Sequence, residues 1–483
     1  MHTNETRTDI FIGSKFVPAA SEEMIEVISP VTEEVIGRVP AANKEDIDRA
    51  VAAARSAFDT GVWSELQLEE RIGVLGRFLA AYSRRREQIA EAISSEVGSP
   101  IEWSTLNQAS APIAVLKYYM RMAPDFDWER VESTRSGPVH VRREPVGVVA
   151  AIVAWNAPHF VAFNKIVPAL IAGCSVVLKT SPENGLSTQL LAEAATEAGF
   201  PKGALSIVAA DRGPSAHLAA HPSIDEVAFT GSVGAGQAIM GRAASHLTRV
   251  HLELGGKSAA IVLDDADLDR TMEELVPATI PNNGQACVAM SRVLAPRSRY
   301  EEIVRRLAME FRAMTIGNPL EPTTIVGPLA SERQRERVEG YIAKGIEEGA
   351  RVVVGGGRPA GFEAGWYVEP TLFADVDNSM TIAREEIFGP VVVVIPFDDD
   401  DEAIRIANDS DYGLHGTIFS ADEQRAMSIA RRLRTGNVSI NGYGISLSVP
   451  FGGYKKSGIG RELGPEGLDA FLESKSIYTV TGR

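Results

Sequence analysis

Apolar residues recur along this chain with two different spacings, which separate predicted helices from predicted strands. Helical spacing starts at residues 47–58, where Asn43 to Asp46 form a polar N-terminal cap, and returns from about Leu66 to Ser95. Between Val131 and Val149 the pattern changes to β-rich alternation around the turn signal Ser136-Gly137-Pro138. These patterns predict two helical regions followed by a β-hairpin.

From Gly147 onwards, short apolar strands alternate with helices. The predicted elements are a strand at 148–153, a helix at 161–172, a strand at 175–178, a helix at 186–198, and strands at 205–208 and 226–229. This βαβ order is typical of a doubly wound parallel sheet. A second α/β series is predicted from 258 to about 439, with helices at 299–314 and 331–348, a strand at 391–395, and a last strand-like run at 476–480.

Length and charge limit the possible functions. The chain has 483 residues, of which 45% are hydrophobic, and this length predicts at least two domains because single cores stop growing at smaller sizes. It carries 48 Lys and Arg against 64 Asp and Glu, so its net charge of −16 disfavours nucleic acid or an anionic membrane as the main partner. The apolar stretch from Val146 to Leu178 is interrupted by polar residues and prolines, so it does not predict a membrane span.

Cysteine usage and the first residues predict a reducing, cytoplasmic setting. Two cysteines cannot form a disulfide framework, and Met1 to Glu5 lack the basic-then-apolar pattern of a signal peptide. The eight histidines show no paired-ligand spacing, so no metal site is expected.

Cys287 is the strongest candidate for covalent chemistry. It follows the polar run Asn283-Gly284-Gln285-Ala286, a setting that predicts partial exposure and nearby donors that lower the thiol pKa. Cys174, in an apolar run, instead resembles a small buried hydrophobe. A lone cysteine is more often inert, so the assignment of Cys287 needs support from other segments.

A second candidate region joins a strand to a helix through a glycine-rich turn. The run from Glu226 contains Gly231, Ser232 and Gly236 and precedes a predicted helix at 237–244. Such a turn presents backbone N–H groups and the positive end of a helix dipole to an anion such as a pyrophosphate. The run is not the standard G-x-G-x-x-G, so a tight turn without a ligand is nearly as consistent with it.

Three polar residues near predicted strand ends have candidate roles. Lys179 is either a ligand-binding residue at the carboxyl edge of the sheet or an exposed strand-end lysine. Glu253 lies between two leucines, where apolar neighbours would raise its pKa and suit it to general base catalysis; the alternative is an edge-strand glutamate facing water. Asn156 either donates to an oxyanion or forms a turn ahead of Pro158.

In this order, these segments resemble the aldehyde dehydrogenase superfamily from about residue 8 to the C-terminus. The runs Leu252-Glu253-Leu254-Gly255-Gly256-Lys257 and Gly284-Gln285-Ala286-Cys287 are specific to that family. The other matching runs are Ala154-Trp155-Asn156-Ala157-Pro158, Lys179-Thr180-Ser181, Phe229-Thr230-Gly231-Ser232, Glu385-Glu386-Ile387-Phe388-Gly389-Pro390 and Pro450-Phe451-Gly452-Gly453-Tyr454-Lys455-Lys456-Ser457-Gly458.

The resemblance implies an α/β architecture in three parts. A doubly wound nicotinamide-binding domain is expected at 1–121 and 146–255, and an α/β catalytic domain at 256–456. A small β oligomerisation element is expected at 122–145 and 470–483, in a homodimer or homotetramer.

The resemblance also implies a mechanism. Cys287 attacks an aldehyde, the Asn156 amide and the Cys287 N–H hold the oxyanion, and Glu253 activates the water that hydrolyses the thioester after hydride transfer to NAD, with NADP also possible. The implied cofactor residues are Trp155, Lys179, Gly231, Ser232, Gly236, Leu254, Glu386 and Phe388. The implied proton relay is Lys165 and Glu462, and the implied substrate tunnel consists of Ala157, Val161, Asn164, Ala286, Val288, Ile445 and Phe451.

Two other functions use the same fold. A CoA-acylating dehydrogenase shares the cysteine and the cofactor but generally lacks the glutamate found here as Glu253. A non-catalytic binding or structural protein would not need Cys287, Glu253 and Asn156 together. The intact set therefore favours a hydrolytic enzyme.

The chain departs from the family pattern in two places. Pro182 stands where many NAD-preferring members carry a glutamate that repels the 2′-phosphate of NADP, so that repulsion is expected to be weaker here. Ala157 and Asn164 stand where better-known members often carry an aromatic residue and a tryptophan, and the implied tunnel residues include no cation. An uncharged, apolar aldehyde is therefore expected as the substrate.

Overall fold

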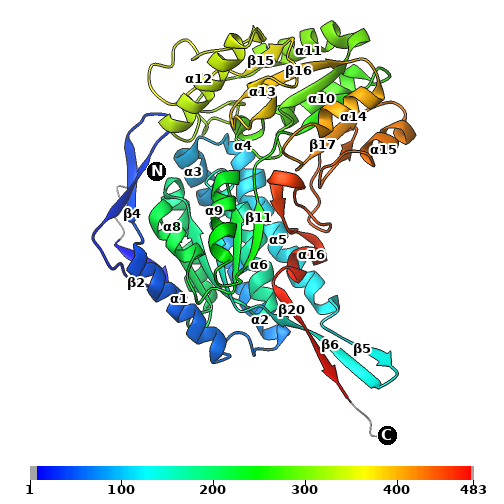
Figure 1. The fold of residues 1–483 in the computed structure, drawn as a ribbon. Helices are drawn as coiled ribbons and strands as arrows, with labels where there is room; N and C mark the ends of the chain where they lie inside the picture. The colour runs from blue at the N-terminus through cyan, green and yellow to red at the C-terminus, as the bar shows by residue number, and fades with distance from the viewer. Residues whose placement is uncertain (1–7, 480–483) are drawn as a thin grey trace.

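The computed structural model describes residues 8–479 and is built around two large sheets (Figure 1). The strands of the first sheet are β1 (Asp9–Ile12), β2 (Lys15–Pro18), β7 (Val148–Ile152), β8 (Ser175–Thr180), β9 (Leu205–Ala209), β10 (Glu226–Thr230), β11 (Arg249–Glu253) and β19 (Gly458–Ile459). Their order is β19-β11-β10-β7-β8-β9-β1-β2, and the five strands from β11 to β9 are parallel to one another.

The second sheet is also mainly parallel. Its strands are β12 (Ala259–Val262), β13 (Arg292–Pro296), β14 (Arg351–Val354), β15 (Thr371–Ala374), β16 (Val391–Phe397), β17 (Gly416–Phe419) and β18 (Ser439–Ile440). Their order is β14-β15-β16-β13-β12-β17-β18, with only the edge pair β14 and β15 antiparallel. The predicted α/β fold with a doubly wound parallel sheet is confirmed.

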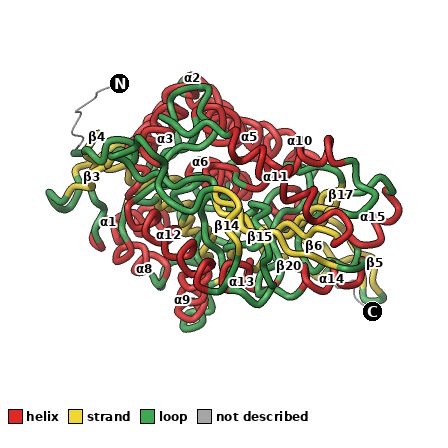
Figure 2. The backbone as a smooth tube through the Cα atoms, turned by 90° about the horizontal axis from the view of Figure 1, so that it is seen from above, coloured by secondary structure: helices red, strands yellow, loops and turns green. Residues whose placement is uncertain are grey.

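Helices cover both faces of the first sheet because its strands bury side chains on both sides. In β7, Val149 and Ala151 belong to one apolar cluster, whereas Val148, Ala150 and Ile152 belong to another. The helices on the first face are α2 (Leu68–Arg84), α3 (Arg86–Val97), α5 (Ala111–Met122), α6 (Pro158–Ala172) and α7 (Gly185–Ala198), and those on the second are α1 (Lys44–Asp59), α8 (Arg212–Ala219) and α9 (Val233–Ala243). Figure 2 shows α2, α3 and α5 on one side and α1, α8 and α9 on the other.

The second sheet repeats this arrangement. In β12, Ala259 and Ile261 face one cluster and Ala260 and Val262 the other, as the period of two along a strand requires. The first cluster includes α12 (Glu332–Glu347), α13 (Thr381–Arg384), α14 (Asp400–Asn408) and α15 (Glu423–Ala430), and the second includes α10 (Leu268–Thr279) and α11 (Tyr300–Ala313).

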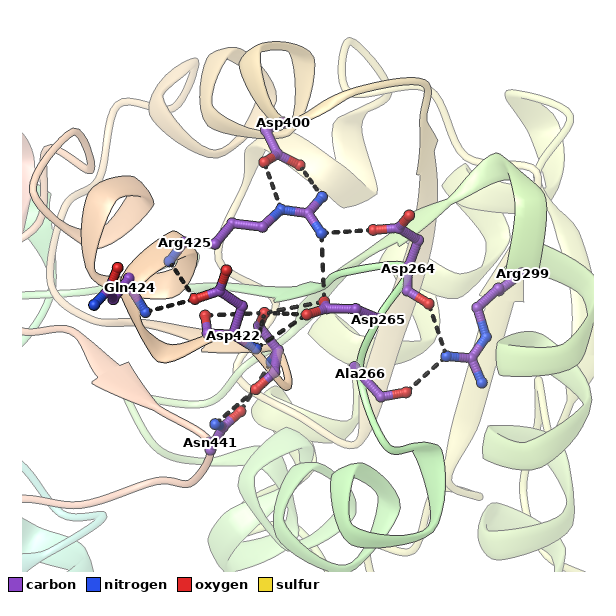
Figure 3. A network of polar contacts seen from close by, with 10 residues as sticks. Asp264, Asp265, Ala266, Arg299, Asp400, Asp422, Gln424, Arg425 and Asn441 are labelled. Carbon is purple, nitrogen blue, oxygen red and sulfur yellow. Dashed lines mark hydrogen bonds and ion pairs between the residues drawn. The ribbon is translucent and has the colours of Figure 1, made fainter.

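Arg425 ties α14 and α15 to the loop that follows β12 (Figure 3). Its guanidinium donates to both carboxylate oxygens of Asp400, at 2.8 and 2.6 Å, and to Asp264 at 2.7 Å. Asp422 caps α15 by accepting from the backbone N–H groups of Gln424 and Arg425. We call the side chains of Asp264, Asp265, Asp400, Asp422 and Arg425 the Arg425 network.

A separate three-stranded sheet extends from the body toward the C-terminus (Figure 1). It consists of β5 (Glu129–Thr134), β6 (Gly137–Pro145) and β20 (Leu472–Tyr478), in the order β20-β6-β5, with both pairs antiparallel. The predicted hairpin is therefore present, and its partner is the predicted last strand. That strand begins four residues earlier than expected, and residue 480 lies outside the described residues.

Several element boundaries differ from the predicted ones. The long helical region is divided at Arg85 into α2 and α3, and α9 begins at Val233 rather than at Gln237. The strand β8 continues through Lys179 to Thr180. In α1 the predicted cap is confirmed, because Asn43 and Asp46 form a reciprocal capping box.

The remaining elements are short. They are β3 (Met24–Ile28), β4 (Val35–Pro40), α4 (Ile101–Trp103), η1 (Ser104–Ser110), η2 (Ala123–Asp125), η3 (Pro182–Asn184), η4 (Pro281–Gly284), η5 (Arg297–Arg299), η6 (Lys455–Ser457) and α16 (Gly464–Asp469). Between residues 8 and 479, every helix is too short or too polar to cross a bilayer.

Candidate active site

A cleft of about 990 Å³ brings together most of the residues that the sequence singled out. The predicted residues in its wall are Trp155, Asn156, Ala157, Val161, Asn164, Gly231, Ser232, Glu253, Leu254, Ala286, Cys287, Val288, Glu386, Phe388, Ile445, Phe451 and Glu462. Lys165, Lys179 and Gly236 do not line it. The wall is formed by residues that follow strands of both large sheets and by residues of the C-terminal segment, so the cleft joins parts of the chain that are far apart in sequence.

Cys287 lies on a loop with an unusual backbone. Asn282 and Asn283 have φ values of 52° and 60°, and Gly284 follows at 74°, so three successive residues adopt left-handed conformations. The Asn283 side chain holds this loop by donating to the carbonyls of Gly98 and Pro328, at 2.8 and 3.0 Å, and by accepting from the Gly327 N–H at 2.7 Å. Asparagine tolerates this conformation better than most residues do.

Two glycines allow the Cys287 loop to approach its neighbours closely. A Cβ on Gly256 would lie 2.1 Å from the Cys287 carbonyl oxygen, and one on Gly284 would lie 2.0 Å from the Gly389 carbonyl oxygen. Any larger residue at either position would push these backbones apart. The two family-specific sequence runs are therefore in direct contact in the structure.

Glu253 is the last residue of β11 and lies beside Glu462, although 209 positions separate them along the chain. The short strand β19 pairs antiparallel with β11, and Phe451 pairs with Glu462 in an isolated bridge. These pairings bring the C-terminal segment to the end of β11. Glu253 is 4% exposed, so it is not the water-facing edge residue that the alternative interpretation described.

Lys165 and Glu462 form a buried ion pair, with side chains 1% and 4% exposed, in which Glu462 lines the cleft and Lys165 does not. The Lys165 ammonium also donates to the Thr230 hydroxyl at 2.6 Å, and the Asn164 amide donates to Glu462 at 3.4 Å. Both Lys165 and Asn164 come from α6, and Asn164 lies on the cleft wall. The two residues of the predicted proton relay are thus in direct contact.

Burial sets the protonation of the two reactive groups. It raises the pKa of the Glu253 carboxyl well above its usual value, and the Glu462 carboxylate raises it further. Burial likewise raises the pKa of the Cys287 thiol, with additional contributions from Glu253 and Glu386. The expectation of a lowered thiol pKa is therefore wrong for this structure, because negative charge and burial outweigh the nearby donors. Cys287 is partly exposed as predicted, and Cys174 is buried.

Asn156 directs its side chain at the cysteine loop. Its amide nitrogen donates to the Gln285 carbonyl at 2.9 Å, two residues before Cys287. A primary amide carries two N–H groups, so one remains for another acceptor. This position fits the predicted oxyanion donor.

The glycine-rich turn after β10 lies on the cleft wall, but it is shorter than predicted. Ser232 caps α9 by accepting from the Ala235 N–H at 3.4 Å, so Gly236 lies inside the helix. A Cβ on Gly236 would meet the Leu254 side chain at 2.8 Å, whereas one on Gly231 would meet the Phe229 ring at 2.4 Å. Gly236 thus allows α9 to pack on Leu254, and the N-terminus of α9 at Ser232 is the part that faces the cleft.

Glu386 and Phe388 form the opposite wall of the cleft. Glu386 accepts from the Gly256 N–H at 2.8 Å, and burial raises its pKa to about 7. Phe388, with φ at 65°, makes an edge-to-face contact with Trp155 at 5.5 Å between ring centroids. The family-like segment 385–390 is therefore anchored to the glycines that follow β11.

Lys179 is 6% exposed, so the alternative of an exposed strand-end lysine is wrong. Burial lowers its pKa to about 8, while the charges of Glu183 and Asp211 oppose that change. Lys179 lies in β8, near the carboxyl end of that strand, and it does not line the cleft.

Several residues of the site were missed by sequence reasoning. Arg337 and Gln334, both on α12, donate to the carbonyls of Glu386 and Phe388 at 2.6 and 2.7 Å. Gln108 on η1 donates to the Asn156 carbonyl at 2.8 Å. Their helices show only amphipathic spacing, which does not distinguish such residues from other polar ones. Trp103, Asn107, Ala111, Ala114, Phe160, Tyr443 and Leu447 also line the cleft.

This fold and site define a class of protein: an α/β protein in which a cysteine, a buried carboxyl group and a helix N-terminus share one cleft. Comparison with known proteins specifies the class further. The model of the aldehyde dehydrogenase family matches residues 16–477. The chain therefore belongs to the aldehyde dehydrogenase family and is an enzyme that oxidises an aldehyde with a nicotinamide cofactor.

Similar proteins span almost the whole chain. A geranial dehydrogenase from Castellaniella defragrans is 48% identical over 472 residues, covering 98% of each chain. A 3-succinoylsemialdehyde-pyridine dehydrogenase from a Pseudomonas species is 43% identical over 478 residues, covering 98% of this chain and 99% of the relative. A Mycobacterium tuberculosis aldehyde dehydrogenase solved with NAD+ has a TM-score of 0.97 and 45% identity over all of both chains. A Pseudomonas syringae aldehyde dehydrogenase variant solved with NAD+ and octanal has a TM-score of 0.94 and 39% identity, covering 98% of each chain.

Proposed function

We propose that this enzyme oxidises an uncharged, largely apolar aldehyde to its carboxylic acid, with NAD as the main cofactor and Cys287 as the nucleophile. The observation that supports this most strongly is the convergence of Cys287, Asn156 and Glu253 on one cleft wall, above the buried Lys165–Glu462 pair. A protein that only bound aldehydes would not need a buried base and a relay beside a thiol.

In the first half of the reaction, the Cys287 thiol loses its proton to solvent, its Sγ bonds to the carbonyl carbon of the aldehyde, and the π electron pair of the C=O bond moves to the oxygen. The oxyanion that forms accepts hydrogen bonds from the free N–H of the Asn156 amide and from the Cys287 backbone N–H. Because the fold holds these donors in place, they stabilise the oxyanion more than freely moving donors would in solution. The product of this addition is a thiohemiacetal on Cys287.

In the second half, Glu253 removes a proton from the water that attacks the Cys287 thioester. The raised pKa of its carboxyl makes the ionised form a stronger base than an exposed glutamate. Glu462 and Lys165 then offer the proton a route away from the base, since they form one buried pair next to it. Hydrolysis releases the carboxylic acid and the free thiol.

The cleft also fits a nicotinamide dinucleotide. Gly231 lines the cleft, where it allows the backbone to pass close to the Phe229 ring, and the N-terminus of α9 at Ser232 supplies N–H groups suited to a phosphate. Trp155, Leu254, Glu386 and Phe388 would hold the nicotinamide half, Lys179 would contact the adenine-side ribose, and Gly236 would keep α9 close to Leu254. When bound, the cofactor would supply the acceptor for the hydride that leaves the thiohemiacetal carbon, and this oxidation, with loss of the hydroxyl proton, turns the thiohemiacetal into the thioester.

NAD is the proposed main cofactor, with measurable use of NADP. Pro182 begins η3 and carries no carboxylate to repel a 2′-phosphate. The Glu183 carboxylate nevertheless influences Lys179, because its charge raises the pKa of that ammonium. The two neighbours complexed with NAD+ support the preference for NAD.

An apolar substrate is favoured by the wall of the tunnel. Ala157, Val161, Asn164, Ala286, Val288, Ile445 and Phe451 line it without a cation that could pair a substrate carboxylate. The two cationic residues of the cleft wall, Arg333 and Arg337, lie on α12, and Arg337 is bound to the Glu386 segment. A relative named for geranial and a neighbour solved with octanal support an apolar aldehyde.

The same proposal includes the division of the chain and its assembly. The ranges 1–121 and 146–255 would form the cofactor domain, 256–456 the catalytic domain, and 122–145 with 470–483 the oligomerisation element; residues 1–7 and 480–483 of these ranges lie outside the described residues. Exposed Val131, Ile477 and Tyr478 on β5 and β20 support a contact with another copy in a homodimer or homotetramer. A cytoplasmic location remains a prediction.

Rapid mixing of the enzyme with NAD and an aldehyde panel tests the proposed chemistry. Wild type should reduce NAD with neutral apolar aldehydes, and Glu253→Gln should show an early burst followed by a slow steady state. Normal burst and steady-state phases in Glu253→Gln would assign the base to another residue. A higher kcat/KM for a semialdehyde acid than for every neutral aldehyde of similar size would reject the apolar substrate class.

A further inference from the structure

Gln108 is a buried residue of the cleft wall to which the preceding mechanism gives no role. It lies on η1, a π-helical segment in which the Ala111 N–H donates to the Leu106 carbonyl, five residues back. Its side chain is 1% exposed, and its amide nitrogen donates to the backbone carbonyl of Asn156 at 2.8 Å. Because π-helical turns occur frequently at functional sites, this contact is a candidate for a role in the reaction.

The Asn156 carbonyl has a second donor, which comes from the cysteine loop. The Asn282 amide nitrogen donates to it at 2.9 Å and also to the Gln285 carbonyl at 3.3 Å. The Asn156 amide donates to that same Gln285 carbonyl at 2.9 Å. Asn156, Asn282 and Gln285 are therefore joined in a closed ring of hydrogen bonds between the oxyanion donor and the loop that carries Cys287.

Of these four residues, Gln108 alone lies outside the Asn156 segment and the Cys287 loop. A carbonyl oxygen has two lone pairs, so two donors fix the orientation of its peptide plane more firmly than one donor does. The Asn156 Cα belongs to that plane, and the direction of its side-chain amide depends on it. Gln108 thus holds the Asn156 peptide plane from η1, a segment that is independent of the Cys287 loop.

We propose that Gln108 is a positioning residue, which aims the free N–H of Asn156 at the oxyanion by holding the Asn156 carbonyl. This inference rests on the proposed role of Asn156. Removing an oxyanion donor itself lowers rates by about 10²–10³-fold. Misdirecting that donor is expected to cost less, about tenfold in the rate of hydride transfer. The affinity for NAD should not change, because Gln108 lies beside Asn156 rather than beside α9.

A double-mutant cycle measures whether Gln108 acts through Asn156. The variants are Gln108→Met, which keeps the chain length but has no N–H donor, Asn156→Ala, and the double variant. The readout is single-turnover hydride transfer at saturating NAD and aldehyde. If the inference holds, Gln108→Met is about tenfold slower than wild type, and the double variant is no slower than Asn156→Ala.

The other outcomes of the cycle contradict specific statements. A wild-type rate in Gln108→Met, or losses that multiply in the double variant, would overturn the inference while leaving the role of Asn156 intact. A wild-type rate in Asn156→Ala would instead reject the proposed oxyanion role, and the inference with it.

Gln108→Glu adds a readout that a loss of packing would not change. A carboxyl at this buried position has a raised pKa, and its protonated form can donate to the Asn156 carbonyl whereas its ionised form cannot. Relative to wild type, hydride transfer in Gln108→Glu should therefore recover as the pH falls. A ratio to wild type that stays constant with pH would contradict the inference.

Leu106→Gln is the matched control on the same π-helical turn. The Leu106 side chain is 63% exposed and lies outside the cleft wall, so it belongs to neither the proposed catalytic nor the proposed binding residues. Its replacement should leave the rate of hydride transfer at saturation unchanged. A tenfold slower saturated rate in Leu106→Gln would show that any disturbance of η1 has this effect, and it would overturn the specific role of Gln108.

Discussion

The Arg425 network and the Lys165–Glu462 pair are both built from charged side chains, but they differ in burial. The side chains of Arg425, Asp264 and Asp400 are 31%, 59% and 33% exposed, and the guanidinium holds the pKa of the Asp264 carboxyl below its usual value. Lys165 and Glu462 are almost completely buried, and the pKa of the neighbouring Glu253 is raised. Water thus weakens the first set of interactions, whereas burial strengthens the second.

Because of this difference in burial, we expect the Arg425 network to contribute to stability and the buried groups at the cleft to contribute to catalysis. In the Arg425 network the Arg425 guanidinium lowers the pKa of the Asp264 carboxyl and so favours its ionised form, and the network joins α14 and α15 to the loop that follows β12. In the cleft wall, burial makes ionisation of the Glu253 carboxyl unfavourable, and the ionised form therefore binds a proton strongly, as a base must. Substitutions in the two regions should therefore affect different measurements.

The largest effect is expected for Cys287→Ala. Steady-state oxidation should fall by about 10⁴-fold or more, because the thiol is the group that bonds to the substrate. Thermal unfolding and NAD binding should remain close to wild type, since the hydrogen bond to the sulfur comes from the backbone N–H of Cys287 itself and joins no other segment to the loop. Substantial turnover in the purified variant would reject the covalent mechanism.

Glu462→Gln should affect both rate and stability. It leaves the buried Lys165 ammonium without its carboxylate, which typically costs about 3–5 kcal/mol. Because the Glu462 charge raises the pKa of Glu253, its loss should lower that pKa. Hydrolysis requires ionised Glu253, so its rate rises with pH, and the rising limb should move to lower pH in the variant. The measurement is the pH profile of the steady-state phase together with urea unfolding.

Glu466→Gln serves as the control for that experiment. Glu466 is an exposed acid four residues further along, at the start of α16. The Glu466→Gln variant should have the same pH profile of the steady-state phase and the same free energy of unfolding as wild type. An unshifted profile in Glu462→Gln would show that Glu462 does not govern the ionisation of Glu253.

Arg425→Gln should reduce stability by about 1 kcal/mol and leave kcat unchanged, because partly exposed ion pairs contribute little individually. High salt should narrow the difference in unfolding free energy between variant and wild type, since screening weakens the wild-type pairs. Chemical unfolding at low and high salt measures this effect. A large loss of kcat would mean that the second sheet's outer helices control the cleft.

The smallest effect is expected for Pro182→Glu. A carboxylate at this position should repel a 2′-phosphate and raise the preference for NAD over NADP severalfold. The measurement is kcat/KM for both cofactors in wild type and variant. Strict NAD dependence in wild type, or no change on substitution, would show that Pro182 does not govern the choice of cofactor.

The sequence was most informative where a reactive side chain and glycines that permit a tight turn occur together in one short run. The residues Cys287, Glu253 and Gly231 could be singled out because each lies in a short run that resembles the family's, whereas the local residue types alone left an alternative open for each. The alternating strands were predictable because each strand is bounded by helices or turns.

Other features depended on contacts between distant segments. The pairing of β19 with β11 places Glu462 beside Glu253, and no local pattern indicates that pairing. Gln108 contacts Asn156 from a π-helical turn whose apolar spacing does not differ from that of an α-helix. The raised pKa of Cys287 follows from the surrounding negative charge and burial, which exist only after folding.

The central claim is that Cys287 carries the acyl group and Glu253 releases it. The most direct measurement is the intact mass of Glu253→Gln after brief incubation with NAD and a neutral apolar aldehyde, followed by peptide mapping. We expect a mass increase equal to the acyl group on the peptide that contains Cys287, and no such increase in the variant that also carries Cys287→Ala. Acylation at another residue, or rapid turnover without any acylated protein in Glu253→Gln, would contradict the account.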